Sequence, residues 1–401
     1  MVESMKMNGD KFDDEIKRNV LSKYFAWLAP GEDVLPLFSK EERNWIVDTL
    51  LRKEEFDLNH RDQWGNWDFN FTKEDYKVPY VDMFVTRRIK EKGVSRKSIW
   101  PNEKKFAFWL THDLDVVSSA DPKMLNRMQL KLAMNSEDKT QKLLQGIHAS
   151  YNFLRKLKPY TQDPLWVYEK WVDLEKEFGF DSTFFVFSRP SNEKDVHVYD
   201  CDFVFDDRMK YRGRSCSVAE YILQLSKEGM EVGLHGSYLS WKNSDLLSEQ
   251  KRNIEGVLGK PILAARQHFL HFDIDKTPEA LVRAGIKLDS TMGFNRSVGF
   301  RAGTSFPFMI SNGLMEVPQI IMDGALFNDN SLDYNEQLAQ LEVERILDCV
   351  EEVGGCVTIN FHPNYLLNSI YWNTYKFILN ALKSRNAACM NAERFLAIVQ
   401  K

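Results

Sequence analysis

The sequence has no uninterrupted apolar run that approaches the roughly 20 residues a membrane-spanning helix needs, and it has no excess of positive charge. Its 53 Lys and Arg residues stand against 58 Asp and Glu residues, which gives a formal net charge of −5. An integral membrane protein and a general nucleic-acid binder are therefore not expected. The first 18 residues also lack the apolar stretch of a signal peptide, so we expect a cytoplasmic protein.

Cysteine is scarce and poorly spaced for structural chemistry. None of the five cysteines belongs to a CxxC pair, and their number is odd. A disulfide framework or a thiolate zinc site is therefore not expected, and we interpret these residues as buried, reduced thiols. Internal repeats and low-complexity segments are missing too, which argues against a solenoid. The cysteines are Cys201, Cys216, Cys349, Cys356 and Cys389.

The chain does contain enough apolar residues for a large core, since 43% of its 401 residues are hydrophobic and 13% are aromatic. We predict two regions, a smaller α+β region over residues 1–98 and a larger domain over 99–401. In the first region Ser39 and Glu42 form a capping box before a helix. Trp67, Phe69 and Phe71 alternate with polar residues as in a strand, and a further helix is expected from Pro79.

From residue 99 onward apolar strand-like runs alternate with helical patterns, many of which end at a glycine. This alternation predicts an α/β fold with parallel strands and outer helices, either a barrel or a doubly wound sheet. The expected strands are 106–111, 182–187, 230–234, 315–318 and 356–360, and the expected helices are 165–178, 218–227, 278–284, 371–384 and 392–400.

A basic helical insertion at about 121–160 interrupts the alternation. It holds eight Lys or Arg residues and three acids, a local balance of +5. Three interpretations stay open: a basic lid over an anionic substrate, a helix on a membrane surface, or a helical pair with a solvated basic face.

Polar residues with catalytic potential follow several of the expected strands. Asp113 and Asp115 share one face of a strand because they are two residues apart. One carboxylate of such a pair can hold a cation while the other acts as a general base. His235 directly follows another apolar run, a common position for a metal ligand.

Three further strand ends carry the same kind of residue. Arg266 can orient a catalytic carboxylate, and His268 shares its parity and can face the same site. His362 follows the last strand and can donate a proton to a leaving group. Asp289 is the carboxylate we expect to hold that imidazole and raise its pKa.

The order of these motifs resembles the polysaccharide deacetylases, a carbohydrate esterase 4-like family, from about Trp100 to Lys401. The resemblance implies a distorted, incomplete (β/α) barrel and a divalent metal, with zinc first and cobalt, nickel or manganese as alternatives. In Thr-His-Asp-Leu-Asp it implies that Asp113 is the base and Asp115 a metal ligand. The remaining correspondences are His235, Arg266, Asp289 and His362.

One departure from the family pattern concerns the metal. The family usually has a second histidine four residues after the first, but that position is Leu239 here. His268 can supply the missing ligand; otherwise a water completes the site, or metal binds weakly or not at all. The chain thus resembles a divergent branch with an extra N-terminal region.

The resemblance implies a metal-dependent hydrolase that removes an N-acetyl or other acyl group from an amino sugar, including a nucleotide- or lipid-linked one. Two alternatives stay open, a metal-poor C–N hydrolase (amidase) of the same fold and a non-catalytic carbohydrate-binding relative. The expected partner is a carbohydrate or sugar nucleotide and not nucleic acid; peripheral membrane contact and the oligomeric state stay open.

Overall fold

The computed structural model describes residues 14–56, 59–62, 64–94, 97–119, 121–135, 139–155 and 162–399. A curled sheet forms its centre, with strand order β10-β11-β1-β2-β5-β6-β7-β9-β8 and β12 beside β1. All pairs are parallel except β8 with β9. The strands are β1 Ala107–Leu114, β2 Ser182–Phe187, β5 Glu231–Gly236, β6 Ala264–Gln267, β7 Leu288–Asp289, β8 Phe308–Ser311, β9 Leu314–Glu316, β10 Ile321–Met322, β11 Cys356–Asn360 and β12 Ala388–Cys389.

The expected α/β fold, a distorted and incomplete barrel, is confirmed by this strand order, because the path runs from β10 to β8 without closing. All eight residues of β1 are buried. A strand covered on both faces reads as a continuous apolar run, which is the pattern that the sequence shows at this point.

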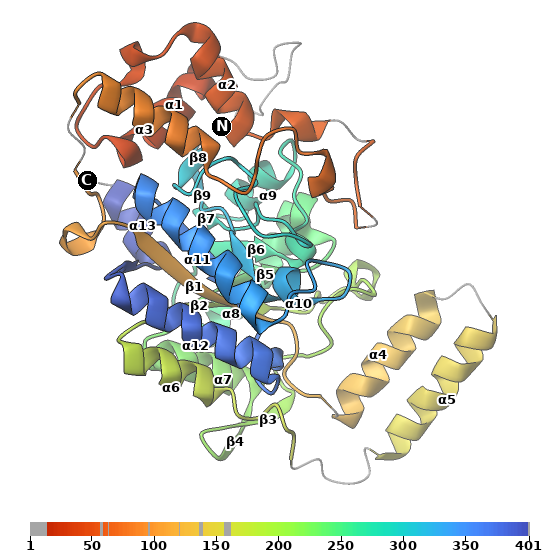
Figure 1. Cartoon of the computed structure of the whole chain (residues 1–401). Helices are drawn as coiled ribbons and strands as arrows, with labels where there is room; N and C mark the ends of the chain where they lie inside the picture. Colours follow the sequence, from red (N-terminus) through yellow and green to blue (C-terminus); the bar gives the residue numbers. More distant parts are fainter. Residues whose placement is uncertain are drawn as a thin grey trace.

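The outer helices include the five that the sequence predicts and three that it does not, Ser244–Leu258, Asp323–Phe327 and Glu336–Val353. Helix α7 starts with a capping box between Ser217 and Glu220, and α6 stops at Gly179, which adopts the left-handed conformation (φ 76°). In Figure 1 α12 and α6 lie together on one side of the sheet. The helices of this part are α6 Glu169–Phe178, α7 Val218–Lys227, α8 Ser244–Leu258, α9 Thr277–Arg283, α10 Asp323–Phe327, α11 Glu336–Val353, α12 Ser369–Ser384 and α13 Ala392–Val399.

The N-terminal region forms a helical cap at one end of the sheet (Figure 1), with α1 Asp14–Leu28, α2 Lys40–Leu50 and α3 Tyr80–Glu91. The strand expected over Trp67–Phe71 is wrong. Trp67 makes only an isolated bridge with Arg61, and Phe69–Phe71 is a 3₁₀ helix. The Asp68 side chain accepts the backbone N–H of Asn70, which favours a turn over an extended chain at this point.

The hydrophobic core continues from this cap into the barrel. Trp27 packs against Trp100 and Phe395, and all three belong to one buried cluster. A buried ion pair joins Glu55 of the cap to Arg301 of the barrel at 2.6 Å. The boundary at residues 98 and 99 stays a prediction, because no break in the core accompanies it.

The basic insertion forms a helical hairpin of α4 Pro122–Asn135 and α5 Lys139–Arg155, which projects away from the sheet (Figure 1). A second, small sheet consists of β3 Arg208–Tyr211 and β4 Arg214–Ser217. Residues 136–138 and 156–161 of the insertion lie outside the described residues. Within the described part of the chain, no helix is long and apolar enough to cross a membrane.

Candidate active site and metal centre

The carboxyl ends of the parallel strands surround a cavity of about 430 Å³. Asp113 and Asp115 enter it from β1, His235 from β5, His268 from the turn after β6, and His362 from the loop after β11. The structure therefore brings together five of the seven residues that we selected from the sequence. The residues come together because parallel strands place their carboxyl ends at one edge.

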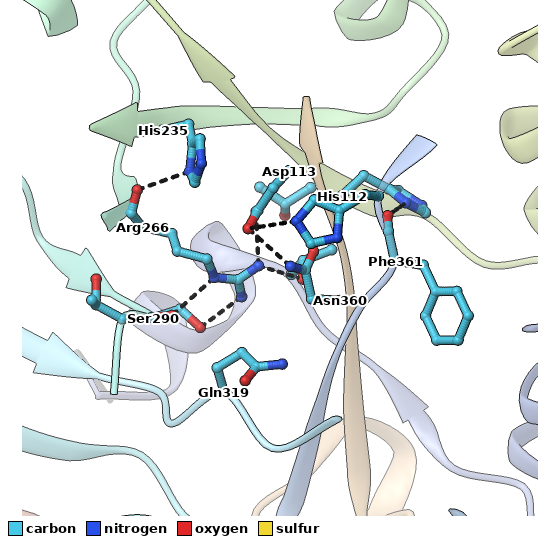
Figure 2. Close-up of polar contacts among 12 residues, drawn as sticks. His112, Asp113, His235, Arg266, Ser290, Gln319, Asn360 and Phe361 are labelled. Carbon is cyan, nitrogen blue, oxygen red and sulfur yellow. Dashed lines mark hydrogen bonds and ion pairs between the residues drawn. The ribbon is translucent and has the colours of Figure 1, made fainter. Parts of the chain in front are cut away.

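Asp113 is held from two sides (Figure 2). Its Oδ1 accepts a hydrogen bond from Arg266 Nη1 at 3.0 Å, and its Oδ2 accepts one from Asn360 Nδ2 at 2.9 Å. Burial raises the pKa of Asp113, but the positive charge of Arg266, with that of His362, outweighs burial and leaves the pKa below its ordinary value. Asp113 is therefore an ionised, oriented carboxylate at neutral pH.

Arg266 is fully buried, and its guanidinium has a partner in each direction (Figure 2). It donates to the Ser290 carbonyl from Nε and to the Ser290 hydroxyl from Nη2, each at 2.9 Å. Nη1 also donates to the Thr111 hydroxyl at 2.8 Å, and the guanidinium carbon lies 4.5 Å from the centre of the Phe185 ring. These contacts fix the guanidinium plane that orients Asp113.

His362 lies across the cavity with its Nε2 4.0 Å from Asp113 Oδ2 and 3.6 Å from Asp115 Oδ2. The expected pairing of this imidazole with Asp289 is wrong, because the partner is Asp323, whose Oδ1 is 2.7 Å from His362 Nδ1. Asp323 Oδ2 also accepts the backbone N–H of His362 at 2.7 Å. Burial lowers the pKa of His362, but Asp323 with Asp115 and Asp113 raises it to about 10.

Asp289 lies elsewhere, fully buried beside Glu316 of the neighbouring strand. The Thr291 hydroxyl donates to Asp289 Oδ1 at 2.6 Å, and the same Thr291 oxygen accepts the backbone N–H of Gln267 at 3.0 Å. Burial raises the pKa of both carboxyl groups, which favours one shared proton over two adjacent charges. Asp289 thus supports the backbone below the cavity.

His235 has the features of a metal ligand. Its Nδ1 lies 3.1 Å from the carbonyl oxygen of Arg266. A carbonyl only accepts hydrogen bonds, so Nδ1 carries the proton and Nε2 has the free lone pair. That Nε2 is buried without a hydrogen-bond partner and lies 3.2 Å from Asp115 Oδ1. A lone pair facing a carboxylate calls for a cation between them.

His268 lies on the other side of the same oxygen, with its Nε2 3.6 Å from Asp115 Oδ1. Nitrogen and oxygen ligands of a tetrahedral zinc ion lie about 3.4 Å apart when each bond is about 2.1 Å. The two measured distances bracket that value. Each histidine therefore lies at a suitable distance from Asp115 to share a divalent cation with it, although among the described residues His235 does not belong to the group of ligand atoms that all lie within 4.8 Å of one another. Burial raises the pKa of Asp115, but His268, His235 and His362 bring the pKa well below its ordinary value.

The turn that carries His268 is held by the N-terminal region. Phe269 adopts a positive φ of 57°, and its carbonyl accepts a hydrogen bond from Asn66 Nδ2 at 2.9 Å. The ring of Trp64 stacks on Phe269 with centroids 5.7 Å apart. The N-terminal region thus reaches the candidate metal centre through this turn.

Cys201 is a neighbour that sequence reasoning did not select. Its Sγ lies 3.8 Å from Asp115 Oδ1, and Asp115, Cys201 and His268 each offer a ligand atom within 4.8 Å of the others. A Zn–S bond of about 2.3 Å would put sulfur and oxygen ligands about 3.5 Å apart. Cys201 had no motif around it, because its place at the site depends on a loop that follows β2.

Other polar residues of the motifs serve packing. His112 is fully buried between the Phe361 carbonyl at 2.6 Å and Glu175 Oε1 at 2.7 Å. His271 stacks on Trp241 with centroids 4.4 Å apart, in line with its opposite parity to His268. Leu239 is not among the described residues that line the cavity.

Two other site residues were missed by sequence reasoning. Asn360 lies in a motif from which only His362 was selected. Asp323 directly follows the short apolar run Ile320–Met322. The polar residue after a short apolar run was the available signal for Asp323.

No family model matches the chain, and no curated protein matches it. Similar solved structures include a protein described as a polysaccharide deacetylase from Mycobacterium smegmatis, at 16% identity and a TM-score of 0.48, with 75% of this chain and 92% of that one covered. A Pseudomonas aeruginosa PAO1 protein described in the same way has 10% identity and a TM-score of 0.45, covering 78% and 95%. Puue allantoinase has 10% identity and a TM-score of 0.44, covering 75% and 91%. Two of these structures thus carry the description of the family that the sequence motifs resemble.

Proposed function

We propose that this chain is a metal-dependent hydrolase that removes an N-acetyl or other acyl group from an amino sugar. The observation that carries the proposal is a pair of groups facing one cavity in opposite protonation states. Asp113 is held ionised by Arg266 and Asn360, while His362 is held protonated by Asp323. Amide hydrolysis needs a base for the attacking water and an acid for the departing amine.

Asp115, His235 and His268 would hold the divalent cation, with zinc first. When bound there, such an ion supplies a Lewis acid that polarises a carbonyl and lowers the pKa of water. Asp113 takes a proton from the water that attacks the acyl carbon. His362 gives the Nε2 proton to the nitrogen as the C–N bond breaks, which releases a free amine and a carboxylic acid.

The far wall of the cavity supports a sugar substrate. The cavity is lined by the aromatic rings of Trp64 and Tyr365 and by four asparagines, with Arg296 beside them. Rings stack on sugar faces and carboxamides bond hydroxyl groups, while an arginine suits an anionic substituent such as the diphosphate of a nucleotide- or lipid-linked sugar. The four asparagines are Asn295, Asn328, Asn330 and Asn364.

The basic insertion is not needed for that role. None of the described residues in 121–160 lines the cavity, so the interpretation as a lid has no support in these contacts.

The first experiment combines metal analysis with a substrate panel. We expect about one equivalent of zinc, cobalt, nickel or manganese in protein purified without chelator, and loss of that metal in the Asp115→Ala/His235→Ala double variant. The exposed α5 histidine variant His148→Ala is the matched control and should keep the metal. N-acetylated amino-sugar nucleotides and glycolipids should be hydrolysed with metal and not after chelation.

Two results would contradict the proposal. Hydrolysis of an amide that persists without metal would favour the metal-poor amidase. Metal retention together with sugar binding, but no hydrolysis across the panel, would favour a carbohydrate-binding relative.

A further inference from the structure

The α4–α5 hairpin has an apolar stripe that faces solvent. Leu143, Ile147 and Tyr151 follow one another at intervals of four residues on α5 and are exposed by 66%, 55% and 62%. Residues spaced in this way share one helix face. Leu144 and, on α4, Leu130 are also exposed, by 46% and 48%.

The stripe is turned away from the partner helix. Ala149 of α5 is 5% exposed, and its carbonyl accepts a hydrogen bond from Asn126 Nδ2 of α4. At 100° per residue, Ala149 lies on the side of α5 opposite to Ile147. The leucines, isoleucine and tyrosine therefore do not serve the packing of the hairpin itself.

Exposed lysines lie beside the N-terminal end of this stripe. Helices α4 and α5 contain six Lys or Arg residues and no acid. Over 121–160 the balance is +5, while the chain as a whole carries −5, so the rest of the molecule carries −10. Lys139 and Lys142 of α5 are exposed and have no ion-pair partner among the described residues. Apolar side chains framed by lysine are typical of helices that lie on an anionic lipid surface.

The base of the hairpin is fixed to the body near the cavity. Lys131 Nζ contacts the Asp200 carbonyl and Asp202 Oδ1, each at 2.7 Å, and Arg127 pairs with Asp207. The segment between Asp200 and Asp202 contains Cys201, which lies beside Asp115. The hairpin is thus attached to a segment that borders the candidate site.

We propose that the α5 face of this hairpin docks the protein on the surface of a membrane that contains anionic lipid. The apolar stripe enters the headgroup boundary, and Lys139 and Lys142 contact the lipid phosphates. This is peripheral binding and does not depend on the hydrolytic chemistry proposed above.

The test is flotation of the full-length protein with vesicles of phosphatidylcholine alone or mixed with phosphatidylglycerol. We expect binding to the mixed vesicles and release by high salt, because exposed charge pairs are screened. Each lysine near an anionic surface changes affinity about fivefold, so Lys139→Glu/Lys142→Glu should weaken binding at least about 25-fold. Leu143→Ser/Ile147→Ser should weaken it at least about tenfold.

Matched controls exist on the body of the protein. Leu338 and Leu341 of α11 are exposed by 48% and 66%, so Leu338→Ser/Leu341→Ser removes similar apolar area elsewhere. Lys227→Glu/Lys260→Glu reverses two exposed lysines outside the hairpin. Neither control should change vesicle binding by more than about twofold.

Three results would overturn the proposal. The first is no binding of the wild type to mixed vesicles, and the second is binding that the hairpin variants leave unchanged. The third is a wild type that binds no lipid and is a dimer by light scattering, together with a Leu143→Ser/Ile147→Ser variant that is a monomer. That result would assign the face to a second copy of the chain. Circular dichroism of each variant identifies misfolding, and the charge-reversal pair tests the proposal if the apolar pair fails to fold.

Discussion

Replacing Asp323 with Asn should change the protonation of His362 more than any other single isosteric change. The carboxylate Oδ1 lies 2.7 Å from His362 Nδ1, and Asp323 is fully buried. Asn keeps the shape and one acceptor oxygen but removes the charge. The substitution therefore tests whether Asp323 is the group that makes His362 an acid.

The size of the effect follows from the pKa. The rise of the His362 pKa from 6.5 to about 10 corresponds to about 5 kcal/mol in favour of the imidazolium, which Asp323, Asp115 and Asp113 supply against burial. Loss of an opposite charge in direct contact lowers a pKa by about 1 to 3 units. We expect the pKa of His362 to fall to about 8 in Asp323→Asn.

A lower pKa of His362 should reduce both activity at alkaline pH and the stability of the fold. His362 must be protonated to donate, so the alkaline limb of kcat/KM should move to lower pH in the variant. A raised folded-state pKa stabilises the fold fully below the unfolded pKa of about 6.5, and this stabilisation is lost as pH rises through about 10. Asp323→Asn should therefore lower the free energy of unfolding most at neutral and acidic pH.

The direct measurement is the titration of His362 by NMR with nitrogen-labelled histidine. The chain has eight histidines, and the one signal missing in His362→Gln assigns the resonance. The titration is made after chelation, because a cation beside Asp115 would itself repel the imidazolium. Asp289→Asn, which changes the carboxylate first expected to hold His362, is the control and should leave the pKa within about 0.3 units. A His362 pKa near 6.5 in the wild type, or an equal fall in both variants, would refute the reasoning.

Three shorter predictions concern metal, stability and sulfur. His235→Ala should weaken zinc binding by at least about tenfold in competition with a chromogenic chelator; unchanged affinity would remove His235 from the ligand set. Glu55→Ala should lower the free energy of urea unfolding by about 3 to 5 kcal/mol, because it leaves Arg301 buried without its partner, and a loss below about 1 kcal/mol would show that the cap is not integral. In cobalt-loaded protein, Cys201→Ser should abolish a near-ultraviolet thiolate charge-transfer band that Cys216→Ser retains; a wild type without the band would exclude Cys201 as a ligand.

Much of the site could be predicted from the sequence because parallel strands bring their carboxyl ends together. Asp113, His235 and Arg266 each stand at the end of an apolar run, and β1, β5 and β6 lie close in the sheet. The sequence also separated His268 from His271, but by a strand parity that does not apply to the 3₁₀ turn His268–Leu270. These inferences required only the alternation of elements and a period of two, not the strand order.

The partner of His362 could not be predicted in that way, because it depends on strand order. His362 follows β11, and the neighbour of β11 at the sheet edge is β10, a strand of two residues that precedes Asp323. Asp289 is the last residue of β7, which is five places away from β11 along the sheet. A strand of two residues shows no periodicity, so the sequence did not predict β10 or the role of Asp323 after it. The longer motif around Asp289 predicted the wrong carboxylate for that reason.

The role of the N-terminal region shows the same dependence on long-range contacts. Trp64 and Asn66 lie in an irregular segment for which the sequence predicted no site residue. Both nevertheless contact Phe269, some 200 residues away along the chain. Phe269 has a positive φ, which an aromatic residue adopts only when its surroundings hold it. The adjacent His268 faces Asp115 because of this turn. His268, the proposed substitute for the histidine that is missing at Leu239, is thus positioned by residues of the N-terminal region, so the proposed metal centre would depend on that region as well as on the barrel.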